Sequence, residues 1–153
     1  MQLINTMQLQ TINPNEDKTN PLYASEDCQQ LIDVYNNYYP QIGFHKPWHG
    51  YFILRQNQVV GCCGFVQQPQ NNQVEVSYGT FKQFEGQGIA SFACQQLISI
   101  AWQNNPQLII TAKTEPRPNA STKILQKHNF VYSHVVQDHE IGDAWFWLLN
   151  PTK

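Results

Sequence analysis

Apolar positions along the chain recur at two spacings, and these predict where helices and strands lie. In residues 89–104, apolar side chains follow one another at intervals of three and four, which predicts an amphipathic helix. Ser25 and Asn119 are residue types that often cap the start of a helix, and each precedes a shorter run of the same kind. We therefore expect helices over residues 25–40, 89–104 and 119–128.

Shorter apolar or alternating runs predict seven strands. They cover residues 7–12, 51–55, 59–66, 73–81, 107–113, 130–136 and 144–150. Short polar turns join the second, third and fourth runs, which favours an antiparallel meander, whereas the helix after the fourth run allows a crossover between parallel strands. The order β-α-β-β-β-α-β-α-β-β predicts a mixed, mostly antiparallel sheet with packed helices, of the α/β or α+β class, in a single domain over residues 1–153.

Composition narrows the kinds of partner that the chain can have. Charged residues make up 13% of the 153 residues, about half the usual share, and the net charge is −2 without a cluster of lysine or arginine. This argues against a nucleic-acid partner, whose phosphates need basic side chains. No apolar run approaches the roughly 20 residues that span a bilayer, so we expect no membrane partner either.

Cysteine usage and the N-terminus favour a cytoplasmic location. The four cysteines, Cys28, Cys62, Cys63 and Cys94, include no Cys-x-x-Cys pair, and apolar elements around them favour buried, reduced thiols over disulfides. The first ten residues lack the basic start and apolar stretch of a signal peptide. These features predict a cytoplasmic protein, and they leave open whether it forms a homodimer.

The stretch FEGQGIAS, residues 84–91, joins a predicted strand to the long helix and carries two glycines, Gly86 and Gly88. At such a place the N–H groups of the first helical turn are unpaired, and glycine lets a phosphate come close. A dinucleotide fingerprint would need a third glycine where Ser91 stands, and a P-loop would need Gly-Lys-Ser/Thr. What remains is the pattern Gln-x-x-Gly-x-Gly-x-Ala over residues 83–90.

This pattern resembles the pyrophosphate loop with which the GNAT N-acetyltransferase superfamily binds acetyl-CoA. A second stretch, NASTKILQKHNF at residues 119–130, resembles the signature Asn-x-x-Ser-x-x-Val/Ile-Leu-x-Lys-x-Gly-Phe of one branch, which contains the ribosomal-protein N-terminal acetyltransferases and related small-molecule acetyltransferases. The resemblance runs from about residue 50 to the C-terminus and implies a GNAT-like fold. The chain departs from the pattern at Asn129, in place of a glycine, and at Gln126, where many members carry a tyrosine that protonates the thiolate.

The resemblance implies an enzyme that moves acetyl from acetyl-CoA to a primary amine, either a peptide N-terminus or a small-molecule amine. The amine would attack the thioester directly in a ternary complex, without a covalent enzyme intermediate and without a metal. A non-catalytic acyl-CoA sensor or binding module is the alternative. His45 and His49 do not suggest a metal site, because Pro47 between them prevents a regular helix and no acid or cysteine stands nearby.

Two residues are expected to carry the chemistry. Glu75 lies on a strand where the family often places a glutamate, and the resemblance implies that it is the general base, although its alternation with valines also suits a solvent-facing strand residue. By the same resemblance, Ser121 would lie near the cofactor's sulfur and protonate the departing thiolate, with Tyr132 as a second candidate. The structural alternative for Ser121 is a place in the helix cap.

The resemblance also implies which residues meet acetyl-CoA. They lie at the end of the strand before the glycine loop, where Gly79 would fit a β-bulge, in the loop itself, and on the third helix. The expected cofactor residues are Tyr78, Gly79, Thr80, Phe81, Phe84, Glu85, Gly86, Gln87, Gly88, Ile89, Ala90, Asn119, Ser121 and Lys127.

An unusually aromatic segment precedes the second strand. In the family this region builds the acceptor site, so the resemblance implies that Tyr38, Tyr39, Phe44 and Trp48 wall an amine pocket and hold a cation over their ring faces. The same side chains would also suit a helix face that packs against the sheet, and the sequence leaves both interpretations open.

Overall fold

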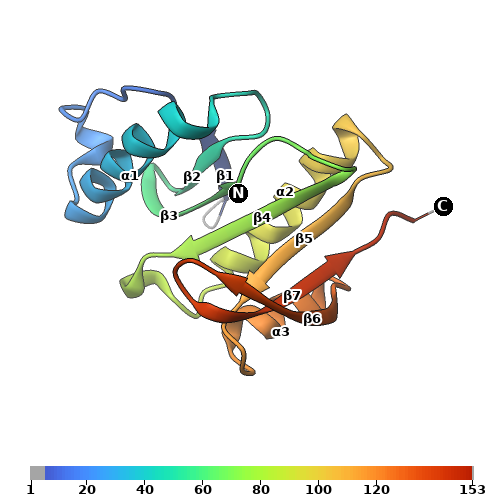
Figure 1. Cartoon of the computed structure of the whole chain (residues 1–153). Helices are drawn as coiled ribbons and strands as arrows, with labels where there is room; N and C mark the ends of the chain where they lie inside the picture. Colours follow the sequence, from blue (N-terminus) through green and yellow to red (C-terminus); the bar gives the residue numbers. More distant parts are fainter. Residues whose placement is uncertain (1–5, 153) are drawn as a thin grey trace.

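Seven strands form one sheet in the computed structural model, which describes residues 6–152 (Figure 1). Their order along the sheet is β1-β2-β3-β4-β5-β7-β6, and neighbouring strands are antiparallel except for the parallel pair β4 and β5. The strands are β1 (Met7–Thr11), β2 (Gly50–Arg55), β3 (Gln58–Phe65), β4 (Gln73–Thr80), β5 (Ile109–Thr114), β6 (Val131–Asp138) and β7 (Gly142–Leu149). This mixed, mostly antiparallel sheet confirms the predicted fold class.

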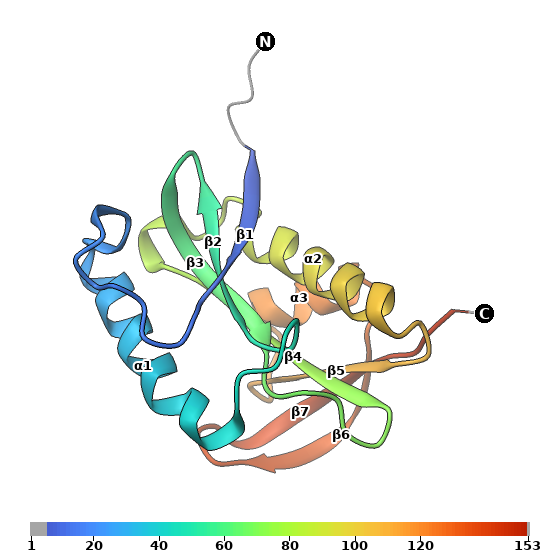
Figure 2. The same cartoon turned by 90° about the horizontal axis from the view of Figure 1, so that it is seen from above.

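Helices lie on both faces of the sheet (Figure 2). α1 covers one face of the β1–β3 half, and α2 and α3 pack against the other face. The helices are α1 (Glu26–Ile42), α2 (Ile89–Asn104) and α3 (Ala120–Lys127), with the 3-10 turns η1 (Pro21–Tyr23) and η2 (Lys82–Phe84). Among the residues that the structure describes, no helix is long and apolar enough to cross a bilayer.

Alternation along β2 explains why both faces are covered. Tyr51 and Ile53 point into the core shared with α2, whereas Phe52 and Leu54 point into a second core beneath α1. Because neither face of this strand meets solvent, its central residues form a continuous apolar run instead of an alternating one.

β4 and β5 separate partway along their length. Their parallel pairing covers three positions, of which the last joins Glu75 to Thr111. β4 then continues to Thr80 and β5 to Thr114 without pairing to each other, and the two strands diverge (Figure 1). We call these diverging segments, residues 76–80 and 112–114, the β4–β5 fork. The β4 arm of the fork leads directly into the loop that carries the two glycines.

The predicted end of the first helix is wrong. α1 continues through Pro40 to Ile42. A proline inside a helix removes one backbone donor, and in the last turn that loss affects a single bond. Gly43, at φ +84°, then closes the helix by donating its N–H to the Tyr39 carbonyl at 2.7 Å.

The prediction of a β-bulge at Gly79 is also wrong. The register of β3 and β4 runs without a shift through the pair Cys62–Gly79. The nearby register shift lies between β2 and β3, where Ile53 pairs with Gly61 and Leu54 with Val59, so that Val60 is the extra residue on β3. A Cβ on Gly61 would lie 2.4 Å from the Gly79 carbonyl oxygen. The close approach of β3 to β4 therefore requires a glycine at position 61, on β3. It does not require one at position 79, on β4.

Candidate functional site

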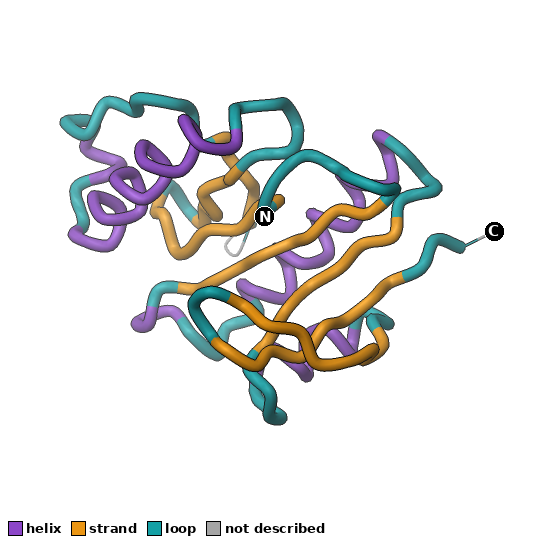
Figure 3. The backbone as a smooth tube through the Cα atoms, viewed as in Figure 1, coloured by secondary structure: helices purple, strands orange, loops and turns teal. Residues whose placement is uncertain are grey.

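The loop between β4 and α2 follows the short η2 helix at the end of β4 (Figure 3). Its backbone adopts conformations that favour glycine. Gly86 and Gly88 have φ of +79° and +81°, in the left-handed region that favours glycine. A Cβ on either residue would meet nothing within 4 Å, so conformation and not crowding favours glycine there. Gly88 is the N-cap of α2, and no side chain caps this end of the helix.

The uncapped start of α2 is suited to an anion. Its first helical bond runs from the Phe92 N–H to the Gly88 carbonyl at 3.1 Å, which leaves the N–H groups of the preceding turn for another partner. Two side chains from the end of α3 lie beside this turn: Lys127 Nζ is 3.1 Å and His128 Nε2 is 3.0 Å from Ser91 Oγ. The helix dipole and the Lys127 charge together suit a phosphate group.

Side chains from two other elements hold the loop in place. Arg55, at the end of β2, donates to Gln87 Oε1 at 2.6 Å and lies over the Phe84 ring, 5.7 Å from its centroid. Gln83 Nε2 donates to Asp27 Oδ2 at 3.3 Å. The loop is therefore connected both to the β2–β3 hairpin and to the first turn of α1.

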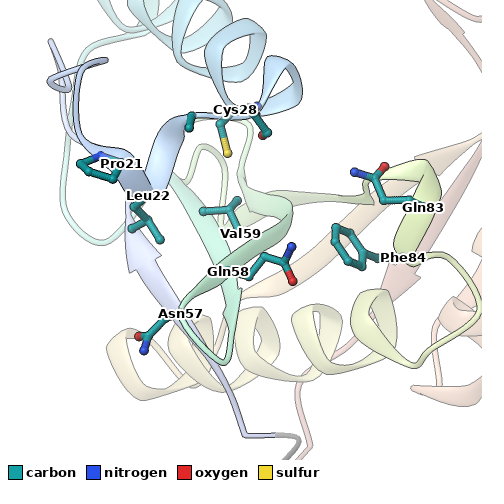
Figure 4. A pocket seen from close by; sticks show the side chains of 10 residues that line it. Pro21, Leu22, Cys28, Asn57, Gln58, Val59, Gln83 and Phe84 are labelled. Carbon is teal, nitrogen blue, oxygen red and sulfur yellow. Dashed lines mark hydrogen bonds between the residues drawn. The ribbon is translucent and has the colours of Figure 1, made fainter.

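A cavity of about 230 Å³ lies beside the loop, between the start of α1 and the β2–β3 hairpin (Figure 4). Its lining includes Cys28 of α1, Gln58 of the hairpin, and Gln83 and Phe84 of η2. Burial raises the pKa of the Cys28 thiol, so the thiol stays protonated at neutral pH. The cavity adjoins the glycine loop but contains neither of the two residues expected to carry the chemistry.

Glu75 lies where the parallel strands begin to separate, on the face opposite α2. Its neighbours Val74 and Val76 point into the core beneath α2, so the carboxylate points the other way. Lys113 Nζ lies 3.7 Å from Glu75 Oε1 and 3.5 Å from Asp138 Oδ1, at the end of β6. Burial raises the pKa of the Glu75 carboxyl, and the Lys113 ammonium opposes part of that rise.

A groove of about 310 Å³ contains both Glu75 and Lys113. Phe146 of β7 forms part of its apolar lining. Five of its lining side chains are carboxamides, namely Gln67, Gln68, Gln70, Asn71 and Gln73. Carboxamides both donate and accept hydrogen bonds, and a carboxylate can accept a proton. The groove is therefore suited to a polar molecule that places an amine at its Glu75 end.

Tyr78, Asn119 and Ser121 come together on the α3 side of the fork. Tyr78 Oη donates to the Ser121 carbonyl at 3.3 Å, and burial raises the pKa of this phenol. Asn119 caps α3 as expected: its Oδ1 accepts from the Thr122 N–H at 3.0 Å, and Thr122 Oγ1 accepts from the Asn119 N–H at 2.9 Å. Tyr132 is exposed on the edge strand β6.

The remaining residues that are expected to contact the cofactor point in different directions. Gly79 and Glu85 are exposed, whereas Ile89 is 1% exposed and packs into the core shared with α2. Phe81 packs against the core beneath α1. Any contact that Ile89 makes with a ligand must therefore come from its backbone N–H.

Tyr38 is the member of the aromatic segment that reaches the groove. Its Oη donates to the carbonyl of Val66, a residue that lines the groove, at 2.8 Å. Burial raises the pKa of this phenol, and the negative charges of Glu75 and Glu140 raise it further. The hydroxyl of Tyr38 therefore lies within electrostatic reach of the Glu75 carboxylate.

The other three aromatic residues pack into the protein. Tyr39 is 4% exposed, and its hydroxyl donates to the Ile12 carbonyl at 2.7 Å, which makes it part of the core beneath α1. Phe44 packs edge-on against Tyr39, with ring centroids 5.1 Å apart. Trp48 packs edge-on against Phe65 at 5.0 Å.

Within residues 6–152, no group of three or more His, Cys, Asp and Glu side chains could hold a metal ion. Cys62, Cys63 and Cys94 are free thiols, and burial raises the pKa of each. His49 is 2% exposed and stacks on Phe44. The thiols of Cys63 and Cys94 and the His49 ring are therefore packed inside the protein, and Cys62 is half-buried.

Lys113, Asp138 and Arg55 lie at the site but are not among the sequence predictions. Their sequence signal is weak, since each is simply a charged residue at or near the end of a predicted strand. Their importance depends on which strands are neighbours and in what register, and a single sequence does not specify this.

Comparison with protein-family models finds the model described as acetyltransferase (GNAT) domain, which matches residues 6–131. Among curated proteins, the uncharacterized N-acetyltransferase p20 of Bacillus licheniformis is 32% identical over 89 residues, which are 58% of this chain and 50% of that protein. The match thus spans half the length of this relative.

Solved structures share the fold at low sequence identity. The apo form of RimL, the ribosomal L7/L12 alpha-N-protein acetyltransferase, superimposes with a TM-score of 0.69 at 16% identity, over 95% of this chain and 94% of that one. The yncA protein of Salmonella typhimurium, with its cofactor acetyl-CoA, gives a TM-score of 0.63 at 16% identity, over the same shares of the two chains. At such identities the likeness is one of fold.

Proposed function

The chain belongs to the GNAT acetyltransferase family, and from this premise we propose that it transfers an acetyl group from acetyl-CoA to a primary amine. The proposal rests above all on β4, which has Glu75 where the fork begins and the glycine loop at its end. Between Glu75 and Thr80 the strand spans about 17 Å. A cofactor anchored at the loop by its phosphates can lie along this arm and present its thioester near Glu75.

The residues around the loop fit the phosphates of acetyl-CoA. Gly86 and Gly88 let the pyrophosphate approach the N–H groups at the start of α2. Lys127 supplies positive charge beside the same turn, and Asn119 lies toward the pantetheine arm. Backbone groups of β4 beyond Val76, which have no partner on β5, can hydrogen-bond to the arm and to the thioester carbonyl.

Glu75 accepts a proton from the acceptor's ammonium group, directly or through water. The neutral amine then attacks the thioester carbon, so that a C–N bond forms and the C–S bond breaks. CoA leaves as a thiolate, for which the Ser121 hydroxyl is the proposed proton donor and Tyr132 the second candidate. The nitrogen loses its second proton as the amide forms, and this proton restores the hydroxyl of the donor. The products are the acetylated amine and CoA, and Glu75 returns its proton to solvent. No metal takes part in this sequence.

The acceptor binds in the groove, with its amine at the Glu75 end. It is either a peptide N-terminus or a small-molecule amine, since the carboxamides of the groove can pair with the polar groups of both. Tyr38 lies at the rim of the groove and can hold a cation over its ring face. Phe44 and Trp48 are proposed to extend this aromatic wall. Tyr39, which is buried, supports the wall from the core by packing against Phe44. We assign the reaction to the cytoplasm.

A thermal-shift titration with acetyl-CoA, CoA and NAD tests the proposal, followed by a thiol-release screen over peptides and small amines. A ligand that binds only the folded state stabilises it by about 2.7 kcal/mol at one hundred times its Kd. We expect stabilisation by acetyl-CoA and CoA but not by NAD, and CoA release with at least one amine.

The two stages separate the possible failures. No stabilisation by acetyl-CoA would contradict the assigned role of the glycine loop. Stabilisation without CoA release from any peptide or amine would contradict the transferase and leave the non-catalytic acyl-CoA sensor.

A further inference from the structure

Lys113 places a primary amine of the protein itself beside the proposed base. Its Nζ lies 3.7 Å from Glu75 Oε1 and 3.5 Å from Asp138 Oδ1. Its side chain is 29% exposed and lines the groove. Among residues 6–152, Lys113 is the lysine that forms an ion pair with Glu75.

The position of Lys113 on β5 brings it to the fork. It lies two residues beyond Thr111, the last residue of β5 that pairs with β4. Side chains two apart on a strand share a face, and Thr111 shares its face with its partner Glu75, so the Lys113 side chain projects from the Glu75 face at the start of the gap. A thioester that reaches Glu75 along β4 therefore also comes within range of the Lys113 amine.

On the basis of the proposed function, we propose that Lys113 is a self-acetylation site. When acetyl-CoA is bound and no acceptor fills the groove, the Lys113 ammonium transfers a proton to Glu75. Its nitrogen attacks the thioester carbon, a C–N bond forms, and the C–S bond breaks. The departing thiolate takes the second proton from the nitrogen, so that the products are Nε-acetyl-lysine and CoA, and Glu75 returns its proton to solvent.

Acetylation at this position changes the groove. The neutral amide no longer pairs with Glu75 and Asp138, so these two carboxylates lose the cation between them. The added acetyl group also occupies space at the end of the groove where the acceptor amine must bind. Self-acetylation is therefore expected to act as a brake that engages when acetyl-CoA is present and acceptor is scarce.

The test is to incubate the full chain with acetyl-CoA alone and follow each lysine by peptide mass mapping. Lys123, exposed on α3, is the matched control because it reports purely chemical acetylation. We expect Lys113 to gain one acetyl group about 10²-fold faster than Lys123, since a positioned base contributes at least that factor. Glu75→Gln should slow the reaction at Lys113 by a similar factor and leave the rate at Lys123 unchanged.

Activity provides a second measurement. Preincubation with acetyl-CoA should reduce the rate of amine acetylation in step with the modification of Lys113. Lys113→Arg, which keeps the positive charge but lacks a primary amine, should show no such decline over the same period, whatever its starting activity.

The results distinguish this inference from the function on which it rests. Suppose that acetyl-CoA binds and amines are acetylated, but Lys113 is acetylated no faster than Lys123, or at the same rate in Glu75→Gln as in the wild type. The inference is then wrong and the function stands. In that case Lys113 serves only as the ion-pair partner of Glu75. If acetyl-CoA does not stabilise the protein at all, both proposals are wrong.

Discussion

Glu75 and Lys113 influence each other as charges, and this determines how the proposed base responds to pH. Burial raises the pKa of Glu75, so its protonated form persists to higher pH than that of an exposed glutamate, while the Lys113 ammonium favours the ionised form. A general base acts only when it is ionised. Activity should therefore fall as the pH falls through this raised pKa.

Glu75→Gln should lower kcat about 10²-fold and remove this fall in activity. Lys113→Gln should move the acid limb of the kcat/KM profile to higher pH, because Glu75 then lacks the cation that stabilises its charge. Profiles for the wild type and both variants with the same amine measure these effects. An acid limb that moves to lower pH in Lys113→Gln would contradict the assigned role, and unchanged stabilisation by acetyl-CoA serves as the binding control.

The two loop glycines allow a sharply controlled substitution. Gly86→Val forces a branched side chain into the left-handed region and should cost about 1–2 kcal/mol of unfolding free energy. Gly142→Val is the matched control, because Gly142 has a φ of +84° and equally open surroundings but is the first residue of β7, directly after the β6–β7 turn. Both variants should lose similar stability, and only Gly86→Val should lose the thermal shift with acetyl-CoA. Equal shifts in both would contradict phosphate binding at the loop.

At the residue scale, sequence reasoning works best where contacts are local. Gly86, Gly88 and Asn119 could be predicted because each role depends on neighbours within a few positions, and Asn129 takes the left-handed conformation expected in place of glycine, at φ +72°. The ion pair of Lys113 could not be predicted, since it depends on the register of two strands that a long helix separates.

At the scale of elements, prediction follows the strength of the local pattern. The bounds predicted for α2 match the observed ones, because its apolar face is long and an Asn-Pro segment ends it. α1 extends past its predicted end because one proline in a last turn is tolerated when Gly43 closes the helix. The pattern of residues alone does not predict the β4–β5 fork, because the residues that diverge still have ordinary strand character. The resemblance to the GNAT family does imply it, since in that family this strand separates from the next one.

The capping box of α3 gives a prediction for this element. Asn119→Ala removes the acceptor for the Thr122 N–H and should lower the free energy of unfolding by about 1 kcal/mol. Gln126→Ala, exposed on the same helix, should change it by less than about 0.5 kcal/mol. Chemical denaturation of both variants measures the difference, and equal stabilities would contradict the importance of the cap.

At the scale of the whole molecule, the fork divides the sheet into two parts. The β1–β4 meander and the β5–β7 strands meet through three parallel pairs, and α2 shares one core with both. A ligand that lies in the fork completes the contact between the parts. The two-sided covering of β2 was not evident from its sequence alone, because an apolar run of that length also suits a strand with one face buried.

Hydrogen exchange tests the fork directly. In the free protein, amides of residues 77–80 that face β5 have no β5 partner and should exchange quickly. Saturating acetyl-CoA should slow exchange in this segment and in residues 84–91. The β6–β7 hairpin, which pairs from Val131 to Asp138 except at Ser133, is the internal control and should be unaffected. Uniform slowing across the chain, without a local excess at the fork, would contradict binding there.

The uncapped start of α2 has a consequence for the life of the protein in a cell. On the proposed function, coenzyme A and its esters supply the missing cap, so the chain that lacks them spends more time in open forms that proteases cleave. When nutrients are plentiful and these cofactors are abundant, the protein should last longer. Its abundance would then follow the supply of its own substrate without a dedicated regulator.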